Sequence, residues 1–233
     1  MCGRYVVPNT SDELLSLFDA SNSNAADWEP SYSVAPTDSA PIVREWIHEE
    51  TVQRDVDFAS WGLKPGWAKP GGPAPINARL ESVASNGMFR SSFASQRCLV
   101  PMAGYYEWQQ MEDGKQPYFL HGDGDVLAAA GLYAARQEDD VWKISFTIIT
   151  RAARDASGEI HDRMPVFLTP DVWGRWLSPE KISDKEEALS MLDRSSVAVA
   201  KTVTAYPVSR VVNNVRTIYS EDPRLIEPIP LAS

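Results

Sequence analysis

The sequence has little cysteine, little histidine and no long apolar run, and each shortage excludes a class of protein. The 233 residues include two cysteines and three histidines, too few for a fold held together by several disulfides. No stretch approaches the roughly 18 consecutive apolar residues of a membrane-spanning helix. The first ten residues also lack the charged-then-apolar layout of a secretion signal. We therefore expect a cytoplasmic protein with reduced thiols and no membrane association.

Positive charge is also scarce. Lysine and arginine total 22 against 32 aspartates and glutamates, a formal net charge of −10 that excludes a globally basic coat for nucleic acid. The charge is uneven along the chain. Residues 1–57 carry a net −8, whereas residues 58–110 carry a net +3. A local basic groove therefore stays compatible with the composition, and residues 58–110 are where we expect it.

The patterns along the chain predict one mixed α+β domain over residues 1–233, with a mainly antiparallel sheet or barrel and a few flanking helices. Capping boxes at Thr10/Glu13 and Ser183/Glu186 and the pair Thr169-Pro170 predict helix starts. Because these helices do not alternate regularly with strands, a parallel α/β fold is disfavoured. Residues 68–75 are a proline- and glycine-rich loop. The predicted strands are 55–61, 98–101, 117–121, 126–132, 142–150 and 197–205.

The second residue carries the most distinctive chemistry of the chain. An initiator methionine is normally removed before a small residue, so we expect Met1 to be cleaved and Cys2 to become the N-terminus. Its amine and thiol then form a 1,2-aminothiol, which condenses with an aldehyde to an imine and closes a thiazolidine ring. Unperturbed pKa values of about 7.7–8.0 and 8.5 leave both groups partly nucleophilic near neutral pH. The alternative is a chance cysteine that only packs in the core.

Three further clusters contain groups suited to catalysis or to phosphate binding. In an extended 76–81 segment, Asn77 and Arg79 project from one face, where they would meet a sugar and a phosphate. Glu107 lies among aromatic residues whose burial would raise its pKa. In an extended run before Pro165, His161 and Arg163 share a side. The alternatives are a surface salt bridge for Arg79, a hydrated Glu107 and a structural His161.

These clusters belong to a set of ordered motifs that spans nearly the whole chain. The sequence resembles the SRAP (SOS-response-associated peptidase) family, whose members shield abasic sites in single-stranded DNA by a covalent DNA–protein cross-link. Eight motifs in the family's order are far more specific than any one of them. The matching words are MCGRY at 1–5, YSVAPT at 32–37, WGLKPGW at 61–67, INARLES at 76–82, RCLVPMAGYYEW at 97–108, KQPYF at 115–119, HDRMPVFL at 161–168 and YPVSRVVNN at 206–214.

The resemblance implies a function and a set of site residues. Cys2 would form the cross-link with an abasic site, first as a Schiff base and then as a thiazolidine, without a cofactor or a metal. An exposed Trp67 could stack on a neighbouring base. We expect a monomer that associates with the nucleoid when bound to damaged DNA. The other positions that match the family are Asn77, Glu107 and His161 in the reaction, and Arg4, Arg79 and Arg163 on the DNA backbone.

The chain departs from some family members at two positions, and two other functions are compatible with its residues. Some relatives have a second aromatic residue where this chain has Ala68, and some have histidine where it has Tyr206. One rival is a peptidase or amidohydrolase in which the amine of Cys2 serves as base for its own thiol. The other is a module that binds single strands without chemistry. That module has no need of an N-terminal cysteine.

Overall fold

The structure, a computed structural model, describes residues 2–69, 71–124, 126–154 and 156–230. No helix in these ranges is long and apolar enough to cross a membrane. The α-helices are α1 (Ser11–Phe18), α2 (Arg90–Ser95), α3 (Pro170–Leu177) and α4 (Lys185–Ala200), and short 3₁₀ helices span Ala156–Glu159, Arg210–Asn213 and Pro223–Ile226. The strands are β1 (Tyr5–Val7), β2 (Asn22–Ser23), β3 (Ser31–Val34), β4 (Ser39–His48), β5 (Thr51–Trp61), β6 (Asn77–Arg79), β7 (Arg97–Met102), β8 (Gly104–Met111), β9 (Gly114–His121), β10 (Leu127–Glu138), β11 (Val141–Ala152), β12 (Arg163–Pro165) and β13 (Thr204–Pro207).

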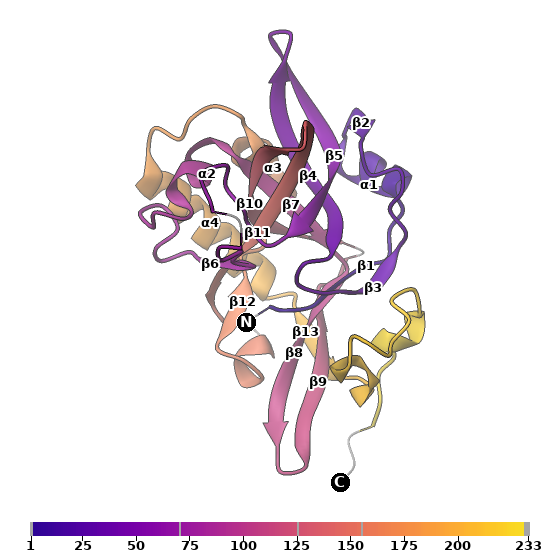
Figure 1. The fold of residues 1–233 in the computed structure, drawn as a ribbon. Helices are drawn as coiled ribbons and strands as arrows, with labels where there is room; N and C mark the ends of the chain where they lie inside the picture. The colour runs from indigo at the N-terminus through magenta and orange to yellow at the C-terminus, as the bar shows by residue number, and fades with distance from the viewer. Residues whose placement is uncertain (1, 70, 125, 155, 231–233) are drawn as a thin grey trace.

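The described strands form two sheets (Figure 1). The smaller has the order β13-β9-β8-β1-β3, and the larger has the order β12-β11-β10-β7-β4-β5-β2 with β6 added beside β11. A parallel pairing of Ser60 with Ser145 joins β5 to β11, so β4, β5, β11, β10 and β7 close into a barrel. Most of the other pairings are antiparallel. The predicted α+β class with a mainly antiparallel sheet or barrel is confirmed.

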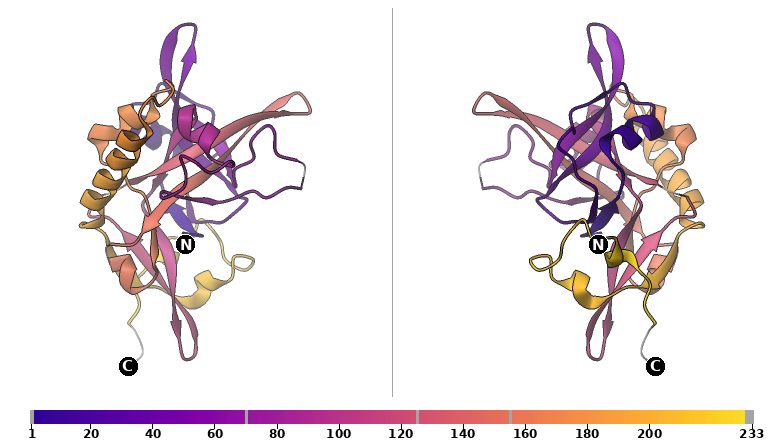
Figure 2. Two further views of the ribbon diagram at one scale, coloured as in Figure 1. Left: turned by 90° about the vertical axis from the view of Figure 1, so that its left-hand side faces the viewer. Right: turned by 90° about the vertical axis from the view of Figure 1, so that its right-hand side faces the viewer.

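The helices and hairpins are distributed unevenly around this barrel. Helices α3 and α4 cover one side of the larger sheet, while the β4–β5 and β10–β11 hairpins project from the barrel in other directions (Figure 2). The β8–β9 hairpin extends from the opposite end of the molecule (Figure 1).

An aromatic cluster fixes the N-terminal strand over the barrel. The ring of Trp61, at the end of β5, stacks 6.3 Å from Phe146 of β11 and meets Tyr5 of β1 edge-on at 5.1 Å. All three residues are almost fully buried. The indole N–H of Trp61 donates to the carbonyl of Ile76 at 2.9 Å, which satisfies its only polar atom. This packing holds β1 and the start of β6 at the same place in the fold.

The small residues of β10 explain why this strand can lie at the centre of the sheet. Residues 127–134 are all buried, and β10 pairs with β7 on one side and β11 on the other. A Cβ atom on Gly131 would lie 2.8 Å from the sulfur of Cys98, so no side chain fits there. The strand runs on to Glu138, beyond the predicted end at Leu132, because its exposed half pairs with β11 into a long hairpin.

The predicted helix starts are close to those observed. Thr10 caps α1 in a complete capping box with Glu13. Thr169 precedes Pro170 at the start of α3 as predicted. Helix α4 begins one residue later than the sequence suggests, because its cap is Asp184, which accepts from the N–H of Glu187 at 2.9 Å. A carboxylate at that position also interacts favourably with the helix dipole.

The strand predicted at 197–205 is wrong over its first half. Residues 197–200 form the last turn of α4, and the strand β13 starts only at Thr204. The β-branched Val197 and Val199 favour a strand locally. The preceding turns of α4 bury Ala188, Met191 and Leu192 against the core, and this packing carries the helix through the two valines because tertiary contacts outweigh weak local propensity.

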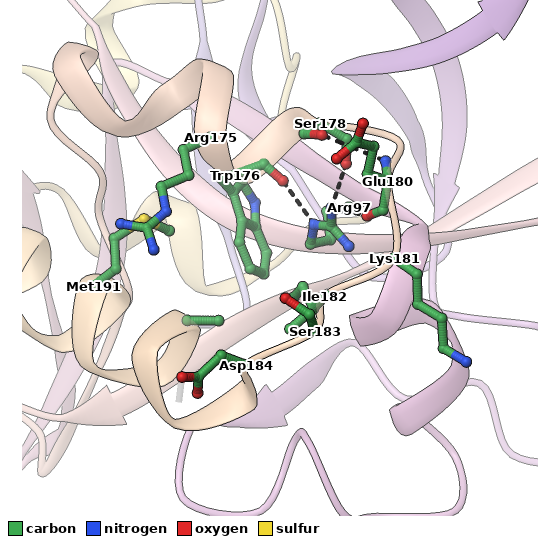
Figure 3. Close-up of a pocket in the computed structure, with 11 residues that line it drawn as sticks. Arg97, Arg175, Trp176, Ser178, Glu180, Lys181, Ile182, Ser183, Asp184 and Met191 are labelled. Carbon is green, nitrogen blue, oxygen red and sulfur yellow. Dashed lines mark hydrogen bonds between the residues drawn. The ribbon is translucent and has the colours of Figure 1, made fainter.

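Arg97 joins α2, α3 and β7 from beneath a cavity of about 360 Å³ (Figure 3). Its side chain is buried. The guanidinium donates hydrogen bonds to main-chain carbonyls and not to a carboxylate. The carbonyls belong to Phe93, Ala94, Trp176, Ser178 and Glu180. Because the guanidinium supplies donors to five carbonyls on three segments, Arg97 links α2, α3 and the segment that follows α3.

Replacing Arg97 by methionine should therefore lower the free energy of unfolding by about 3 kcal/mol or more, the cost of leaving several buried carbonyls unpaired. Denaturant titration would measure the change. The matched control is Arg175→Met on the same cavity, whose side chain is 60% exposed and should contribute less than about 1 kcal/mol. Equal stability of the two variants would contradict the structural role of Arg97.

Candidate functional site

The segment 2–4 is held between the two sheets, beside β6 and β12 (Figure 1). On one side, the amide Nδ2 of Asn77 in β6 donates to the carbonyl of Cys2 at 2.8 Å. On the other, the backbone N–H of Tyr106 in β8 donates to the carbonyl of Arg4 at 2.9 Å. Two elements separated by about thirty residues in sequence thereby fix the N-terminal cysteine. The mainly extended β6 places Asn77 and Arg79 on one face and buries Ala78 on the other, as predicted.

The thiol of Cys2 is fully buried. Burial raises the pKa of the thiol well above its ordinary value, and the negative charge of Glu107 raises it further. At neutral pH the sulfur is therefore protonated. A thiol in this state becomes a nucleophile only when a neighbouring group takes its proton as the new bond forms.

Strand pairing brings Glu107 to this thiol. Tyr5 lies opposite Tyr105 in the antiparallel pair of β1 and β8, and continuing this register places Gly3 opposite Glu107. The carboxyl group is 2% exposed. Burial raises the pKa of Glu107 from 4.5 to about 7, which confirms the shift predicted from its aromatic surroundings. Near neutral pH this carboxyl group can both accept and donate a proton.

His161 lies just before β12, with 29% of its side chain exposed. Its Nδ1 accepts from the backbone N–H of Arg163 at 3.0 Å and also lies 3.0 Å from Oδ1 of Asp162. The neutral ring that accepts from Arg163 carries its proton on Nε2, and the protonated ring pairs with Asp162. Partial burial lowers the pKa of the imidazole, so the neutral ring dominates at pH 7. The exposed carboxylate of Asp162 acts electrostatically on both His161 and Glu107. The imidazole and the carboxyl group therefore lie near the same negative charge.

Arg163 is engaged within the protein. Its guanidinium binds Glu81 through two parallel hydrogen bonds of 2.7 and 3.0 Å and also donates to the carbonyl of Thr150 at 2.7 Å. These contacts tie β12 to the segment that follows β6. The guanidinium lowers the pKa of Glu81, which keeps that carboxylate ionised. A phosphate could occupy the same fork only by replacing Glu81, whose side chain is 56% exposed.

Arg4 is also buried and bonded. Its Nη1 donates to the hydroxyl of Ser33 and to the carbonyl of Val212, both at 3.1 Å. The guanidinium lies 5.7 Å from the ring centre of Trp108. Val212 belongs to the 206–214 motif, so one use of that motif is to support Arg4 from the far end of the chain. These contacts give Arg4 a structural role within the protein.

The remaining two predicted residues face solvent. Arg79 is exposed at the end of β6, and Trp67 is 61% exposed in the loop after β5. The structure thus brings Cys2, Asn77 and Glu107 together and places His161 near the same charges. Sequence reasoning missed Glu81 and Trp108 as partners of the two arginines. The only signal was their position inside the 76–82 and 97–108 motifs.

A metal centre has no evident place here. Among the residues that the structure describes, no group of three or more histidine, cysteine, aspartate or glutamate side chains is arranged to hold a metal ion.

The comparisons with known proteins agree with the motifs. A family model described as SOS response associated peptidase (SRAP) matches residues 1–215. The chain belongs to this family. The abasic site processing protein YedK of Escherichia coli is 32% identical over 234 residues, covering 98% of this chain and 100% of its own. The abasic site processing protein YoqW of Bacillus subtilis is 32% identical over 97% of this chain and 99% of its own.

A more distant relative and two solved structures also match the chain. The abasic site processing protein HMCES of Gallus gallus is 29% identical over 88% of this chain and 68% of its own length. A crystal structure of a Bacteroides thetaiotaomicron protein superposes with a TM-score of 0.78 at 20% identity, covering 98% of this chain and all of that one. A phage-related protein of Bordetella bronchiseptica gives 0.66 at 26% identity, covering 90% and 95%. The solved structures support the fold, and the family is that expected from the motifs.

Proposed function

We propose that this protein processes abasic sites in single-stranded DNA by capturing the opened sugar covalently on Cys2. The observation that carries the proposal is the placement of the buried thiol of Cys2 beside Glu107, a carboxyl group with a pKa of about 7. The full-length relatives named as abasic site processing proteins support the same substrate. The reaction needs neither a metal nor a redox cofactor.

The chemistry proceeds in two balanced steps. Cleavage of Met1 frees the α-amine of Cys2, and its nitrogen attacks the aldehyde carbon of the open-chain sugar; the carbonyl oxygen leaves as water and an imine forms. The sulfur then adds to the imine carbon while the thiol proton ends on the nitrogen. The product is a thiazolidine. Because the Cys2 side chain is fully buried in the structure, capture also requires part of its cover to move aside.

Glu107 supplies the proton transfers that these steps need. The raised pKa of the thiol means that sulfur cannot attack as a pre-formed thiolate. The deprotonated carboxyl group of Glu107 accepts a proton from the amine or thiol, and the protonated form returns one to the departing oxygen. A carboxyl group with an ordinary pKa would be almost entirely ionised at pH 7 and could serve only the first purpose.

Asn77 and His161 have supporting roles in this proposal. Asn77 holds the carbonyl of Cys2 through its Nδ2, and within the described residues its buried Oδ1 has no partner, so that oxygen can accept a hydrogen bond from the freed amine. The neutral ring of His161 can donate from Nε2 to the sugar as it opens. Holding the amine in position compensates for the small fraction of the sugar that is present as the open-chain aldehyde.

The DNA strand would be held by backbone contacts and one stacked base, without reading sequence. Arg4, Arg79 and Arg163 would contact phosphates, and Trp67 would stack on an unpaired base at about 1–3 kcal/mol. We propose a monomer that acts in the cytoplasm and joins the nucleoid at damaged DNA. The imine also acidifies the neighbouring sugar carbon. Strand cleavage by β-elimination is therefore the expected side reaction.

Removing the carboxylate that occupies Arg163 should strengthen DNA binding. The Glu81→Gln variant keeps the side-chain size but removes the charge that competes with a phosphate. Because the Glu81 side chain is 56% exposed, solvent screens this ion pair, which is worth up to about 1 kcal/mol. We expect up to about a fivefold tighter Kd for a single-stranded oligonucleotide by fluorescence anisotropy. Weaker binding would instead mean that Glu81 positions Arg163 for the strand.

A denaturing gel with a single-stranded oligonucleotide that carries one abasic site tests the proposed function. We expect a shifted band that survives heat and detergent, together with an intact mass equal to protein plus DNA minus water. Shortened DNA would reveal the lyase side reaction. Turnover of a peptide substrate without any shifted band would favour the N-terminal-cysteine peptidase, and reversible binding without a band would favour a simple binding module.

A further inference from the structure

A second site lies away from Cys2, at the mouth of the barrel between the β4–β5 and β10–β11 hairpins. The two hairpins project from the barrel and diverge (Figure 2). Between them lies an open cavity of about 650 Å³. Mouths of β-barrels are common ligand sites. We call this cavity the hairpin groove, and its chief lining residues are Arg44, Trp46, Phe58, Trp142, Lys143 and Ile144.

The walls of the hairpin groove are aromatic, and one of them is unusually exposed. Trp142 is 68% exposed. It lies on the same face of β11 as Ile144 and Phe146, because side chains alternate along a strand, so the apolar stripe that begins in the core runs out into solvent. An indole at this exposure contributes little to the fold. Its ring is available for a planar partner.

The floor of the hairpin groove is a fixed cation. The guanidinium of Arg44 lies 5.6 Å from the ring centre of Trp46 and 5.1 Å from that of Tyr133, and its Nε donates to the buried carboxylate of Asp57. These contacts order the side chain, of which 15% is exposed. An ordered guanidinium beside the rings of Trp46 and Tyr133 suits a flat ligand whose edge carries hydrogen-bond acceptors.

The exposed loop that carries Trp67 starts beside β11, the strand that contributes Trp142 to the hairpin groove. The backbone N–H of Lys64, at the start of that loop, donates to the hydroxyl of Ser145 in β11 at 2.9 Å. The loop and the β10–β11 hairpin project from the same side of the molecule (Figure 2). Each of these two projecting segments carries a strongly exposed tryptophan, Trp67 in the loop and Trp142 in the hairpin.

The hairpin groove is close to neutral although the whole chain is acidic, because its basic side chains are paired with carboxylates. Asp57 pairs with Arg44, and Glu138 pairs with both Arg136 and Lys143. The charged residues that line the groove itself are Arg44, Lys143 and Asp57, and the indole of Trp46 donates to the buried carboxylate of Asp55. The acidic turn residues Asp139 and Asp140 lie beyond the groove, at the tip of the hairpin. Alternating aromatic and basic groups are the pattern by which proteins bind single strands.

We propose that the hairpin groove binds an unpaired base of the strand that flanks the captured site, with Trp142 stacked on the base and Arg44 donating to its carbonyl edge. This inference rests on the proposed function. It extends the DNA path past Trp67 and would compensate for Ala68, where a second aromatic residue is missing. The ligand of the groove is therefore nucleic acid and not a protein segment.

A binding series on undamaged oligothymidylates of roughly 4 to 16 nucleotides tests this, because single-strand sites cover that range. The variants are Trp142→Ala, Trp142→Leu, which keeps apolar area without a π-face, and Trp142→Phe, which keeps a ring. We expect the first two to weaken binding of the longest oligomers by about fivefold or more, with no change for the shortest. Trp142→Phe should keep most of the affinity.

Tyr219→Ala is the matched control, since Tyr219 is 80% exposed on the segment near the C-terminus, away from both hairpins (Figure 1). Wild-type affinity of Trp142→Ala at every length would overturn the proposal. So would wild-type affinity of Trp142→Leu, which would indicate an apolar contact and not stacking. Cross-linking of an abasic tetranucleotide should be unchanged in Trp142→Ala. If the wild type formed no adduct while the length effect persisted, only the covalent function would fail.

Discussion

Replacing Cys2 by alanine should abolish the heat-stable adduct with abasic DNA. The variant keeps an N-terminal amine after removal of Met1, so it can still form the imine, but it has no sulfur to close the ring and the imine hydrolyses. Weak binding of the single strand should survive. Reduction with borohydride converts an imine to a stable amine, so the shifted band should return when borohydride is present during the reaction with the alanine variant.

Cys98→Ala is the control for this experiment. Both thiols are fully buried and in both the pKa is raised by burial, but Cys98 lies in β7 within the barrel and cannot expose an amine. It should cross-link like the wild type, apart from a modest loss of stability from the small cavity. A heat-stable band from Cys2→Ala without borohydride would show that another group captures the sugar. Intact mass must confirm that Met1 is absent from each protein.

Glu107→Gln should slow cross-linking by about 100-fold or more, the usual contribution of a positioned acid or base. The loss should depend on pH. Glu107 has a pKa of about 7, so below that value the wild-type carboxyl group is protonated and cannot accept a proton. The ratio of wild-type to variant rate should rise through about pH 7 and then level. The amine titrates in both proteins, and its effect cancels from the ratio.

A stability measurement separates this catalytic role from a structural one. Between pH 4.5 and about 7 the folded chain binds more protons at Glu107 than the unfolded chain, so this residue makes stability fall as pH rises. Above pH 7 its cost is on the order of 3 kcal/mol. The glutamine variant lacks this cost and should become more stable relative to the wild type across that range. A slow variant that was also less stable at pH 8 would contradict the role assigned to Glu107.

Much of the local structure could be predicted because its causes are local. The capping box of Thr10 and Glu13 involves residues three apart, and strands such as 117–121 are set by alternation and flanking turns. The boundary errors have the same origin. Asp184 and Ser183 are both good caps, and the choice between them depends on how α4 packs. Val197 and Val199 entered a helix because residues earlier in α4 were already anchored in the core.

The arginines show where motif matching stops. The sequence predicted that Arg4, Arg79 and Arg163 would contact a DNA backbone, but only the folded chain reveals that Arg163 holds Glu81 and that Arg4 donates to Val212. Those partners are 82 and 208 residues away along the chain. A motif records which residues recur, and it does not record which of them bind one another before a ligand arrives.

The sequence by itself determined the reactive group, because an amine and a thiol on adjacent carbons of Cys2 follow from covalent structure alone. It also determined the fold class, through the patterning of short strands and capped helices. Only the tertiary structure decided the environment of that group. The register of β1 against β8 brings Glu107 to the thiol, and the parallel pairing of β6 with β11 places Asn77 at the Cys2 carbonyl. Proton affinity depends on burial and neighbouring charge, which exist only once distant segments have packed together.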